Sequence, residues 1–239
     1  MFIEKYFNES STGQINFTRQ QASDFAKKVA DDFNPLHNLD AKRFCVPGDL
    51  LFSVIMAKSG LHKQMSFTFS GMVTDSLSLN FPEKITDKAA IVDENNKEYL
   101  QIEVSGEYSN NNVLIDSLTK AYVEFSGHTF PHILVKLMSE HQVMINPARP
   151  MIMYQNMSID MFKLDVENIS LRLAKTSLSI EGKRGDAWLE FDILSSGKVI
   201  GHGKKHMLLS GLREYCQETI DLVVKGYNQS KSEYATHSE

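Results

Sequence analysis

Apolar residues recur at helical spacing in two neighbouring segments of the first quarter of the chain. The first segment opens with a Thr-Arg-Gln-Gln capping box at residues 18–21 and continues with an apolar series: Ala22, Phe25, Ala26 and Val29. The second opens near Gly48 and has a denser apolar series: Val54, Ile55, Ala57 and Leu61. The pattern predicts two helices, of which the second is more deeply buried.

Alternation of apolar and polar residues predicts two sets of antiparallel strands further along the chain. The strands of the first set cover residues 76–81, 99–104 and 113–127, and those of the second set cover residues 169–174, 187–191 and 197–211. The two sets agree in order and spacing, and both end in a Ser-Gly pair. Any two antiparallel meanders would align to some degree, but this agreement favours an internal duplication.

A proline turn between the two predicted helices carries an acidic residue and a histidine. The run Asp-Phe-Asn-Pro-Leu-His begins at Asp32 and ends at His37. On a continuous helix, residues five apart would point about 140° away from each other. Pro35 disfavours helical backbone at Asn34 and should end the preceding helix near Phe33. The turn can then direct the carboxylate and the imidazole into one cavity, or the polar side chains only satisfy hydrogen bonds of the turn.

The turn and the segment after it resemble the start of a MaoC-like domain, the (R)-specific enoyl-CoA hydratase (hydratase 2) family of hot-dog proteins. That family combines an Asp-x-Asn-Pro-x-His turn with a Val-His-Gly-Met-Leu start of its central helix. The turn is complete in this chain, whereas residues 46–50 read Val-Pro-Gly-Asp-Leu. Pro47 therefore stands in the position of the family's histidine, and Asp49 in that of an apolar residue. Asp31 occupies a position that is often glycine.

The resemblance implies an enoyl-thioester hydratase or 3-hydroxyacyl-thioester dehydratase, a hydro-lyase. Asp32 and His37 would be the catalytic pair that adds water to a conjugated double bond. The substrate-binding residues would be Asn34, which orients the turn or the water, Gly48 and Asp49. The Gly48 N–H would bind the developing enolate oxygen at the helix start. We expect Asp49 to cap this helix and to face away from the cavity, where its charge would not oppose the enolate.

The resemblance and the paired half-sheets together predict an α+β, double hot-dog fold, in which two joined antiparallel sheets each wrap a central helix. Residues 1–127 would form the half that carries the turn, residues 128–227 the half without it, and residues 228–239 a polar, frayed tail. The central helices are expected to begin near Gly48 and Phe130. A closing helix is expected over residues 212–227.

Composition and charge narrow the class of protein. The 239 residues, 42% of them hydrophobic, suffice for one large domain or two small ones. No stretch approaches the roughly 18 apolar residues of a membrane span, and the first residues lack a signal-peptide pattern. Two distant cysteines, Cys45 and Cys216, indicate buried free thiols in a reducing compartment, so we expect a cytoplasmic protein. A net charge of −5 without a basic run disfavours nucleic acid as a partner.

The histidines outside the turn do not indicate a metal site. His128 and His132 are four residues apart, but Pro131 lies between them and no third ligand is evident. His202 and His206 share one face of a predicted strand, as surface residues often do. No glycine-rich phosphate loop is present either. We therefore expect neither a metal nor another cofactor.

Two alternatives to the hydratase function follow from the altered helix start. In the first, the protein is a hot-dog acyl-CoA thioesterase in which Asp49 or Asp32 activates water against the thioester carbonyl. In the second, Pro47 and Asp49 have replaced the active sequence, and the chain is a non-catalytic acyl-thioester-binding or assembly protein. In each case the expected partner is an acyl thioester of CoA or of acyl carrier protein. A homodimer is the candidate assembly of the chain.

Overall fold

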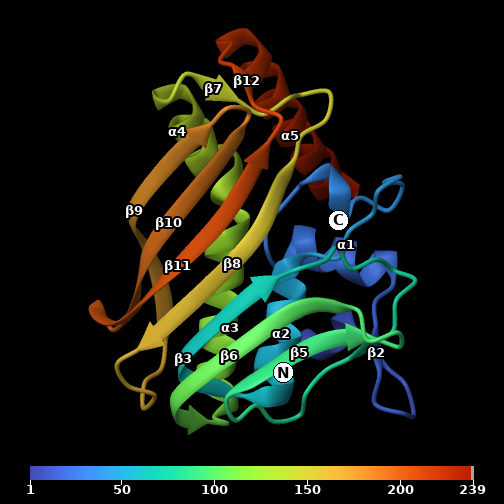
Figure 1. Ribbon diagram of the computed structural model, residues 1–239, viewed down its shortest axis with the longest axis vertical. Helices are drawn as coiled ribbons and strands as arrows, with labels where there is room; N and C mark the ends of the chain where they lie inside the picture. Colours follow the sequence, from blue (N-terminus) through green and yellow to red (C-terminus); the bar gives the residue numbers. More distant parts are fainter. Residues whose placement is uncertain (238–239) are drawn as a thin grey trace.

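The computed structural model describes residues 1–237 and is built around one large antiparallel sheet (Figure 1). Within these residues, ten strands pair in the order β1-β2-β4-β5-β6-β3-β8-β11-β10-β9, and β7 and β12 form a separate two-stranded sheet. The strands are β1 Asn8–Glu9, β2 Ile15–Asn16, β3 Leu61–Phe69, β4 Leu79–Asn80, β5 Lys88–Asp93, β6 Glu98–Ser109, β7 Val143–Met144, β8 Ile152–Met161, β9 Ile169–Glu181, β10 Arg184–Ser195, β11 Lys198–Ser210 and β12 Arg213–Glu214.

The helices α2 and α3 lie behind the large sheet in Figure 1, and both cover the same face. The α-helices are α1 Arg19–Lys28, α2 Gly48–Ser59, α3 Asn112–Gly127, α4 Leu134–Glu140 and α5 Gln217–His237. Short 3-10 helices cover Phe2–Tyr6 and Pro35–His37, and an irregular turn with non-helical backbone at Phe130 covers Thr129–Ile133. The protein is therefore a mixed α and β structure with a large antiparallel sheet, which confirms this part of the predicted fold class.

Both helices predicted near the N-terminus are confirmed. The Thr18 hydroxyl accepts a hydrogen bond from the Gln21 N–H, and the Gln21 side chain accepts one from the Thr18 N–H, which completes the capping box of α1. Helix α1 ends at Lys28, earlier than the expected end near Phe33. The reason is that the chain already turns at Asp31, where φ is +55°. Helix α2 begins at Gly48, as predicted.

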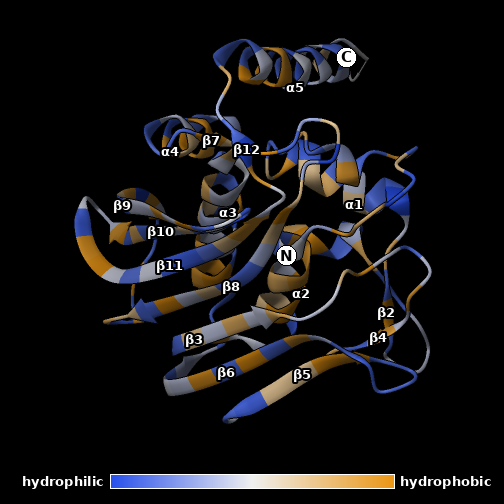
Figure 2. Cartoon of the chain, turned by 45° about the horizontal axis from the view of Figure 1, so that its top comes forward, coloured by the Kyte–Doolittle hydropathy of each residue, from blue (hydrophilic) through white to orange (hydrophobic). Residues whose placement is uncertain are grey.

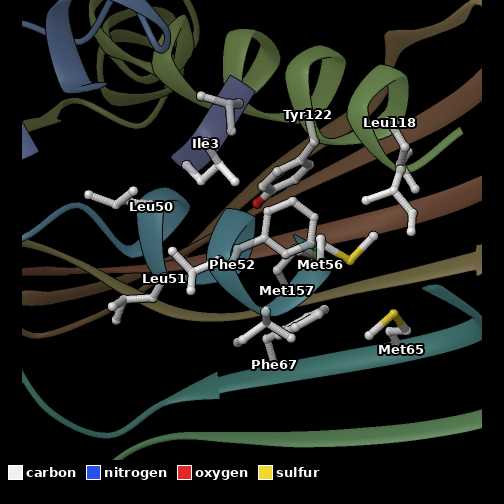
Figure 3. Close-up of a cluster of buried hydrophobic side chains, with 14 of the residues drawn as sticks. Ile3, Leu50, Leu51, Phe52, Met56, Met65, Phe67, Leu118, Tyr122 and Met157 are labelled. Carbon is white, nitrogen blue, oxygen red and sulfur yellow. The ribbon is translucent and has the colours of Figure 1, made fainter. Parts of the chain in front are cut away.

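Helix α2 forms the centre of the main hydrophobic core (Figure 3). The Phe52 ring meets the Phe67 ring of β3 edge-on, with centroids 5.2 Å apart, and the Tyr122 ring of α3 at 4.9 Å. All three side chains are fully buried. Aromatic contacts of this kind contribute beyond the burial of area alone, and here they fix α2 against both the sheet and α3.

The strand predicted over residues 113–127 is wrong, because this segment is the helix α3. Its buried residues Leu114, Leu118 and Tyr122 are four residues apart, which matches one face of a helix as well as it matches alternation. Asn111 caps the helix by accepting hydrogen bonds from the N–H groups of Val113 and Leu114. The proposed duplication paired this helix with strand β11, so the alignment behind it does not hold.

The second central helix was expected near Phe130, and this expectation is also wrong. Residues 129–133 form the irregular turn, and α4 after it has only seven residues. The other predicted strands lie in β6, β9, β10 and β11, whereas residues 76–81 contribute only the two-residue strand β4. Strand β3 pairs with β8, for example through Phe67 opposite Met157, and this pairing joins the two halves of the sheet.

Helix α5 packs against the residues on both sides of Asp32. Tyr227, Lys231 and Tyr234 share one helix face, because they are four and seven residues apart. The rings of Tyr227 and Tyr234 both meet the Phe33 ring edge-on, at 6.0 and 5.8 Å, and Lys231 pairs with Asp31.

The closing helix expected over residues 212–227 starts later and runs further, since α5 covers Gln217–His237. The expected frayed tail is helical up to His237, and residues 238–239 lie outside the described part of the chain. Figure 2 shows α5 at the edge of the molecule.

Two further expectations concern the cysteines and membrane-spanning segments. Both cysteines are free, but Cys216 is exposed and Cys45 only half-buried, so the expected burial is wrong for Cys216. Among residues 1–237, no helix combines the length and the apolar character that a membrane span requires.

The closest backbone approach occurs where the end of α3 meets the residue before Asp31. A methyl group added at Gly127 would lie 1.7 Å from the Ala30 carbonyl oxygen, so Gly127→Ala must displace the backbone. We expect this substitution to lower the free energy of unfolding by about 1–3 kcal/mol or more, the usual cost of overpacking. Denaturant unfolding would measure the change.

Gly226→Ala is the matched control, because Gly226 lies in α5 with open space around it. Alanine should raise stability there by about 0.5–1 kcal/mol, the ordinary preference for alanine over glycine in a helix. Equal effects at the two positions would show that the approach of Gly127 to Ala30 is not as close as described.

Candidate functional site

Three distant segments bring one polar side chain each into the interior of the protein. Asp49 lies in the first turn of α2, Ser126 near the end of α3 and Lys205 on β11. The Ser126 hydroxyl donates a hydrogen bond to Asp49 Oδ2 at 2.5 Å. Lys205 Nζ donates to the Ser126 hydroxyl and, at 3.4 Å, to the Ser126 carbonyl oxygen. Ser126 and Lys205 are only 4% and 5% exposed, so we call these three residues the buried cluster.

Asp49 does not cap its helix, which corrects the expectation from the sequence. The N-cap of α2 is Pro47, and no side chain makes a capping hydrogen bond there. The Asp49 carboxylate instead points to the interior, where Oδ2 is bound by Ser126. Its second oxygen, Oδ1, is buried and has no hydrogen-bond partner among the described residues. The residue as a whole is of intermediate exposure, whereas Oδ1 itself is buried.

The charges of the buried cluster depend on each other. Burial raises the pKa of the Asp49 carboxyl group, and the nearby Lys205 ammonium and the Ser126 hydrogen bond act in the opposite direction. Burial likewise lowers the pKa of Lys205, while the charges of Asp49 and Asp32 raise it. Both shifts have the same cause, since a low-dielectric interior disfavours the charged form of any group.

Aromatic side chains surround the ammonium side of the buried cluster. Lys205 Nζ lies 4.6 Å from the centroid of the Tyr154 ring, a cation–π contact, and the Tyr154 and Tyr122 hydroxyls are hydrogen-bonded to each other. Phe69 stacks on Tyr154 with centroids 4.4 Å apart. A methyl group at Gly48 would lie 3.0 Å from both of these rings. The start of α2 is thus closely packed against the Phe69–Tyr154 stack, which explains a glycine at this position.

The turn brings Asp32 and His37 next to each other. His37 Nε2 lies 3.7 Å from Asp32 Oδ2, which is longer than a hydrogen bond. The His37 Nδ1 atom lies 2.7 Å from the Cys45 carbonyl oxygen, and since a carbonyl only accepts, Nδ1 carries the proton. The His37 side chain is 10% exposed and that of Asp32 28%. Burial raises the pKa of the Cys45 thiol to about 11, so this neighbour is a poor nucleophile.

The remaining polar side chains of the turn hold its backbone. Asn34 Oδ1 accepts a hydrogen bond from the Leu36 N–H at 3.1 Å and caps the 3-10 helix, and Asp32 Oδ1 accepts one from the Asn34 N–H at 2.9 Å. Asp31 adopts positive φ, the conformation in which glycine is favoured. Asp31 pairs with His128 at 3.3 Å and with Lys231.

Helix α5 adds two hydrogen bonds to the same turn. The Tyr227 hydroxyl accepts one from the Phe33 N–H at 3.1 Å and donates one to the Asp31 carbonyl oxygen at 3.2 Å. The backbone on both sides of Asp32 is therefore fixed by one side chain from the C-terminal helix.

The turn and the buried cluster form one electrostatic unit. The Asp32 charge raises the pKa of Asp49, and the His37 charge lowers it.

Of the five site residues predicted from the sequence, four lie in or beside this unit: Asp32, His37, Gly48 and Asp49. The fifth, Asn34, belongs to the turn, and its side-chain oxygen accepts a hydrogen bond from the turn backbone. Sequence reasoning missed Ser126, which lay in a segment taken for a strand, and also Lys205. A signal for Lys205 existed, since alternation along β11 puts it on the same face as Gly203 and Met207.

The histidines considered as metal ligands have other neighbours. The His128 and His132 rings meet edge-on at 5.9 Å, and His128 pairs with Asp31. His206 pairs with Asp186 at 2.8 Å and stacks on Trp188 at 4.1 Å. In the described part of the chain, no three His, Cys, Asp or Glu side chains are grouped so that they could hold a metal ion.

Comparisons with known proteins give one family and several solved structures of partial similarity. A family model described as "Protein of unknown function (DUF3581)" matches residues 1–218. No curated protein matches the chain. Among solved structures, the acyl-CoA thioesterase II TesB2 from Mycobacterium marinum is 6% identical with a TM-score of 0.44, and the match covers 91% of this chain and 99% of that one. The tesB protein of Mycobacterium avium subspecies paratuberculosis is 8% identical with a TM-score of 0.42, covering 72% and 90%.

These comparisons correct the resemblance drawn from the sequence. The family model that matches this chain is that of DUF3581 and not that of the MaoC-like hydratases. Membership in the hydratase family is therefore wrong, and with it the hydratase function that the resemblance implied.

The altered helix start is consistent with this correction, because Pro47 and Asp49 depart from the hydratase signature where the structure builds the buried cluster. The family match extends over residues 1–218 and so includes the turn, the start of α2, the end of α3 and strand β11. The chain belongs to the protein family described as DUF3581.

Proposed function

We propose that this protein hydrolyses acyl thioesters and that Asp49 is the general base. The observation that carries the proposal is Asp49 Oδ1, a buried carboxylate oxygen with no partner among the described residues. A buried acceptor without a partner is costly and needs an explanation, and a catalytic role is one. A water molecule at Oδ1 would satisfy this atom and would be held by a base with a raised pKa.

The start of α2 supplies the other group that the reaction needs. N–H groups in the first turn of a helix have no intrahelical acceptor, and the helix dipole favours negative charge there. The Gly48 and Asp49 N–H groups belong to this turn. They are suited to the oxyanion that forms when the thioester carbonyl is attacked.

The proposed reaction then follows in two steps. Asp49 takes a proton from the water at Oδ1 while the water oxygen bonds to the thioester carbonyl carbon, and the carbonyl oxygen becomes an oxyanion at the start of α2. The oxyanion then collapses, the carbon–sulfur bond breaks, and the leaving thiolate takes the proton from Asp49. The products are a carboxylic acid and a free thiol, of CoA or of acyl carrier protein. No metal ion or cofactor takes part in these steps.

We also infer a double hot-dog arrangement, with one long helix for each half of the sheet. Two contacts support it: Phe52 of α2 meets Phe67 of β3, and Phe125 of α3 meets Phe191 of β10 at 5.0 Å. The pairing of β3 with β8 joins the halves. The division after residue 127 rested on a strand that is a helix, so we propose a division between β6 and α3, at residues 110–111. A cytoplasmic location remains our proposal, supported by the two free cysteines.

The first prediction from this function concerns Asp49 itself. Asp49→Asn should slow thiol release from short and medium acyl thioesters at least about a hundredfold, the scale for loss of a positioned base. A thiol-reactive dye would measure release, and the absorbance of crotonyl-CoA would report hydration of its double bond, which we expect to be absent. The control is Asp165→Asn, an exposed aspartate remote in sequence from the site.

Two results would contradict this prediction. Full thiol release by Asp49→Asn would exclude Asp49 as the base. Binding of acyl thioesters without any release by the unaltered protein would indicate a non-catalytic acyl-thioester-binding protein instead.

The second prediction concerns pH. Because burial raises the pKa of Asp49, the base is protonated over a wider acidic range than an ordinary carboxyl group, whose pKa is about 4. The rate should therefore fall on the acid side at a pH above this ordinary value. Asp32→Asn removes a charge that raises the pKa of Asp49, so it should move the fall to lower pH. Profiles of kcat/KM against pH measure both effects, and a fall at about pH 4 or a shift in the other direction would count against the assignment.

A further inference from the structure

Lys205 is a lysine on the inner face of the sheet, where its neighbours along the strand are Gly203 and Met207. It is 5% exposed, whereas the side chain of the adjacent Lys204 is 57% exposed and pairs with Glu190 at 3.5 Å on the outer face. A fully buried lysine is rare unless it is paired. The burial of Lys205 therefore needs an explanation, whereas the exposed position of Lys204 does not.

The contacts of Lys205 fix the direction of one hydrogen bond. An ammonium group only donates, so the Ser126 hydroxyl must accept from Lys205. A serine hydroxyl has a single proton, and the acceptor at 2.5 Å is Asp49 Oδ2. The chain of donors thus runs from Lys205 through Ser126 to Asp49. It leaves Oδ1 as the carboxylate oxygen that has no partner.

We propose that Lys205 is a positioning residue for thioester hydrolysis: its ammonium group, acting through the Ser126 hydroxyl, holds Asp49 Oδ2 and leaves Oδ1 to the reacting water. This inference rests on the proposed function and deepens it. Lys205 itself touches neither the water nor the thioester. Its charge also compensates that of Asp49 in an interior where an unpaired carboxylate would take up a proton.

The charged and polar groups around Asp49 act in different directions. Lys205 on β11 and Ser126 on α3 both favour the ionised carboxylate, as does His37, whereas Asp32 opposes it. Tyr122, one turn before Ser126 on α3, is neutral because burial raises its pKa far above the physiological range. Among these groups, the charge of Lys205 has the largest effect in favour of the ionised carboxylate. Its removal should therefore leave Asp49 protonated at a higher pH.

The test compares Lys205→Met with Lys204→Met in profiles of kcat/KM against pH. Loss of the buried ammonium group should move the acid-side fall upward by about one pH unit or more. A rise of one unit in the pKa of a base lowers its ionised fraction about tenfold at pH values below that pKa. Raising the pH should restore the rate. Lys204→Met should keep the original profile, because its charge lies on the outer face.

Ser126 gives a second test of the same chain of hydrogen bonds. Ser126→Ala removes the donor to Asp49 and should move the profile in the same direction as Lys205→Met. Ser126→Thr keeps a hydroxyl and should restore much of the original profile. A rate that is lower by the same factor at every pH in Lys205→Met and Ser126→Ala would overturn the proposal, since only a structural role predicts it.

A titration without substrate separates this inference from the proposed function. Carbon-13 NMR of the carboxyl groups, with Asp49→Asn to assign the signal, reports the pKa of Asp49 directly. The pKa should be higher in Lys205→Met than in the unaltered protein, and an unchanged pKa would overturn the role of Lys205. If Lys205→Met does not fold, Ser126→Ala in the same titration decides the question. If no thioester is hydrolysed, the proposed function fails while the titration still tests Lys205.

Discussion

Two opposite charges that share the interior, Asp49 and Lys205, determine where three separate elements of this protein must meet. Each group is disfavoured in its charged form by burial, and each is favoured by the other. Ser126 lies between them and is hydrogen-bonded to both. The start of α2, the end of α3 and the middle of β11 can therefore not shift independently without leaving a charge unpaired.

The packing around this pair serves the same arrangement. Gly127 lets the end of α3 approach the backbone of Ala30 closely. The segment that carries Ser126 and the Asp32 turn therefore lie next to each other in space, although they are far apart in the sequence. Tyr227 of α5 then holds the backbone on both sides of Asp32. The turn that the sequence made conspicuous is thereby fixed beside the buried cluster, where the charges of Asp32 and His37 act on Asp49.

The part of this site that could be predicted is the part that is local in sequence. Asp32 and His37 are joined by five peptide bonds and a proline, so turn chemistry alone indicates that they lie close together. The start of α2 at Gly48 was equally readable from its apolar series. The position of Ser126 was not readable in this way, because the apolar positions of its segment fit a strand and a helix alike. The Asn111 cap is the feature that distinguishes the two. The direction of Asp49 depends on how α2 packs against α3, which no short pattern contains.

The most direct test of the central claim is a structure with a stable ligand analogue, in which a methylene group replaces the sulfur of an acyl thioester. We expect a water molecule within about 3 Å of Asp49 Oδ1 and next to the carbonyl carbon of the analogue. We also expect the carbonyl oxygen to accept a hydrogen bond from an N–H group at the start of α2. An analogue bound elsewhere, or bound with Asp49 shielded from its carbonyl group, would contradict the assignment of Asp49 as the base.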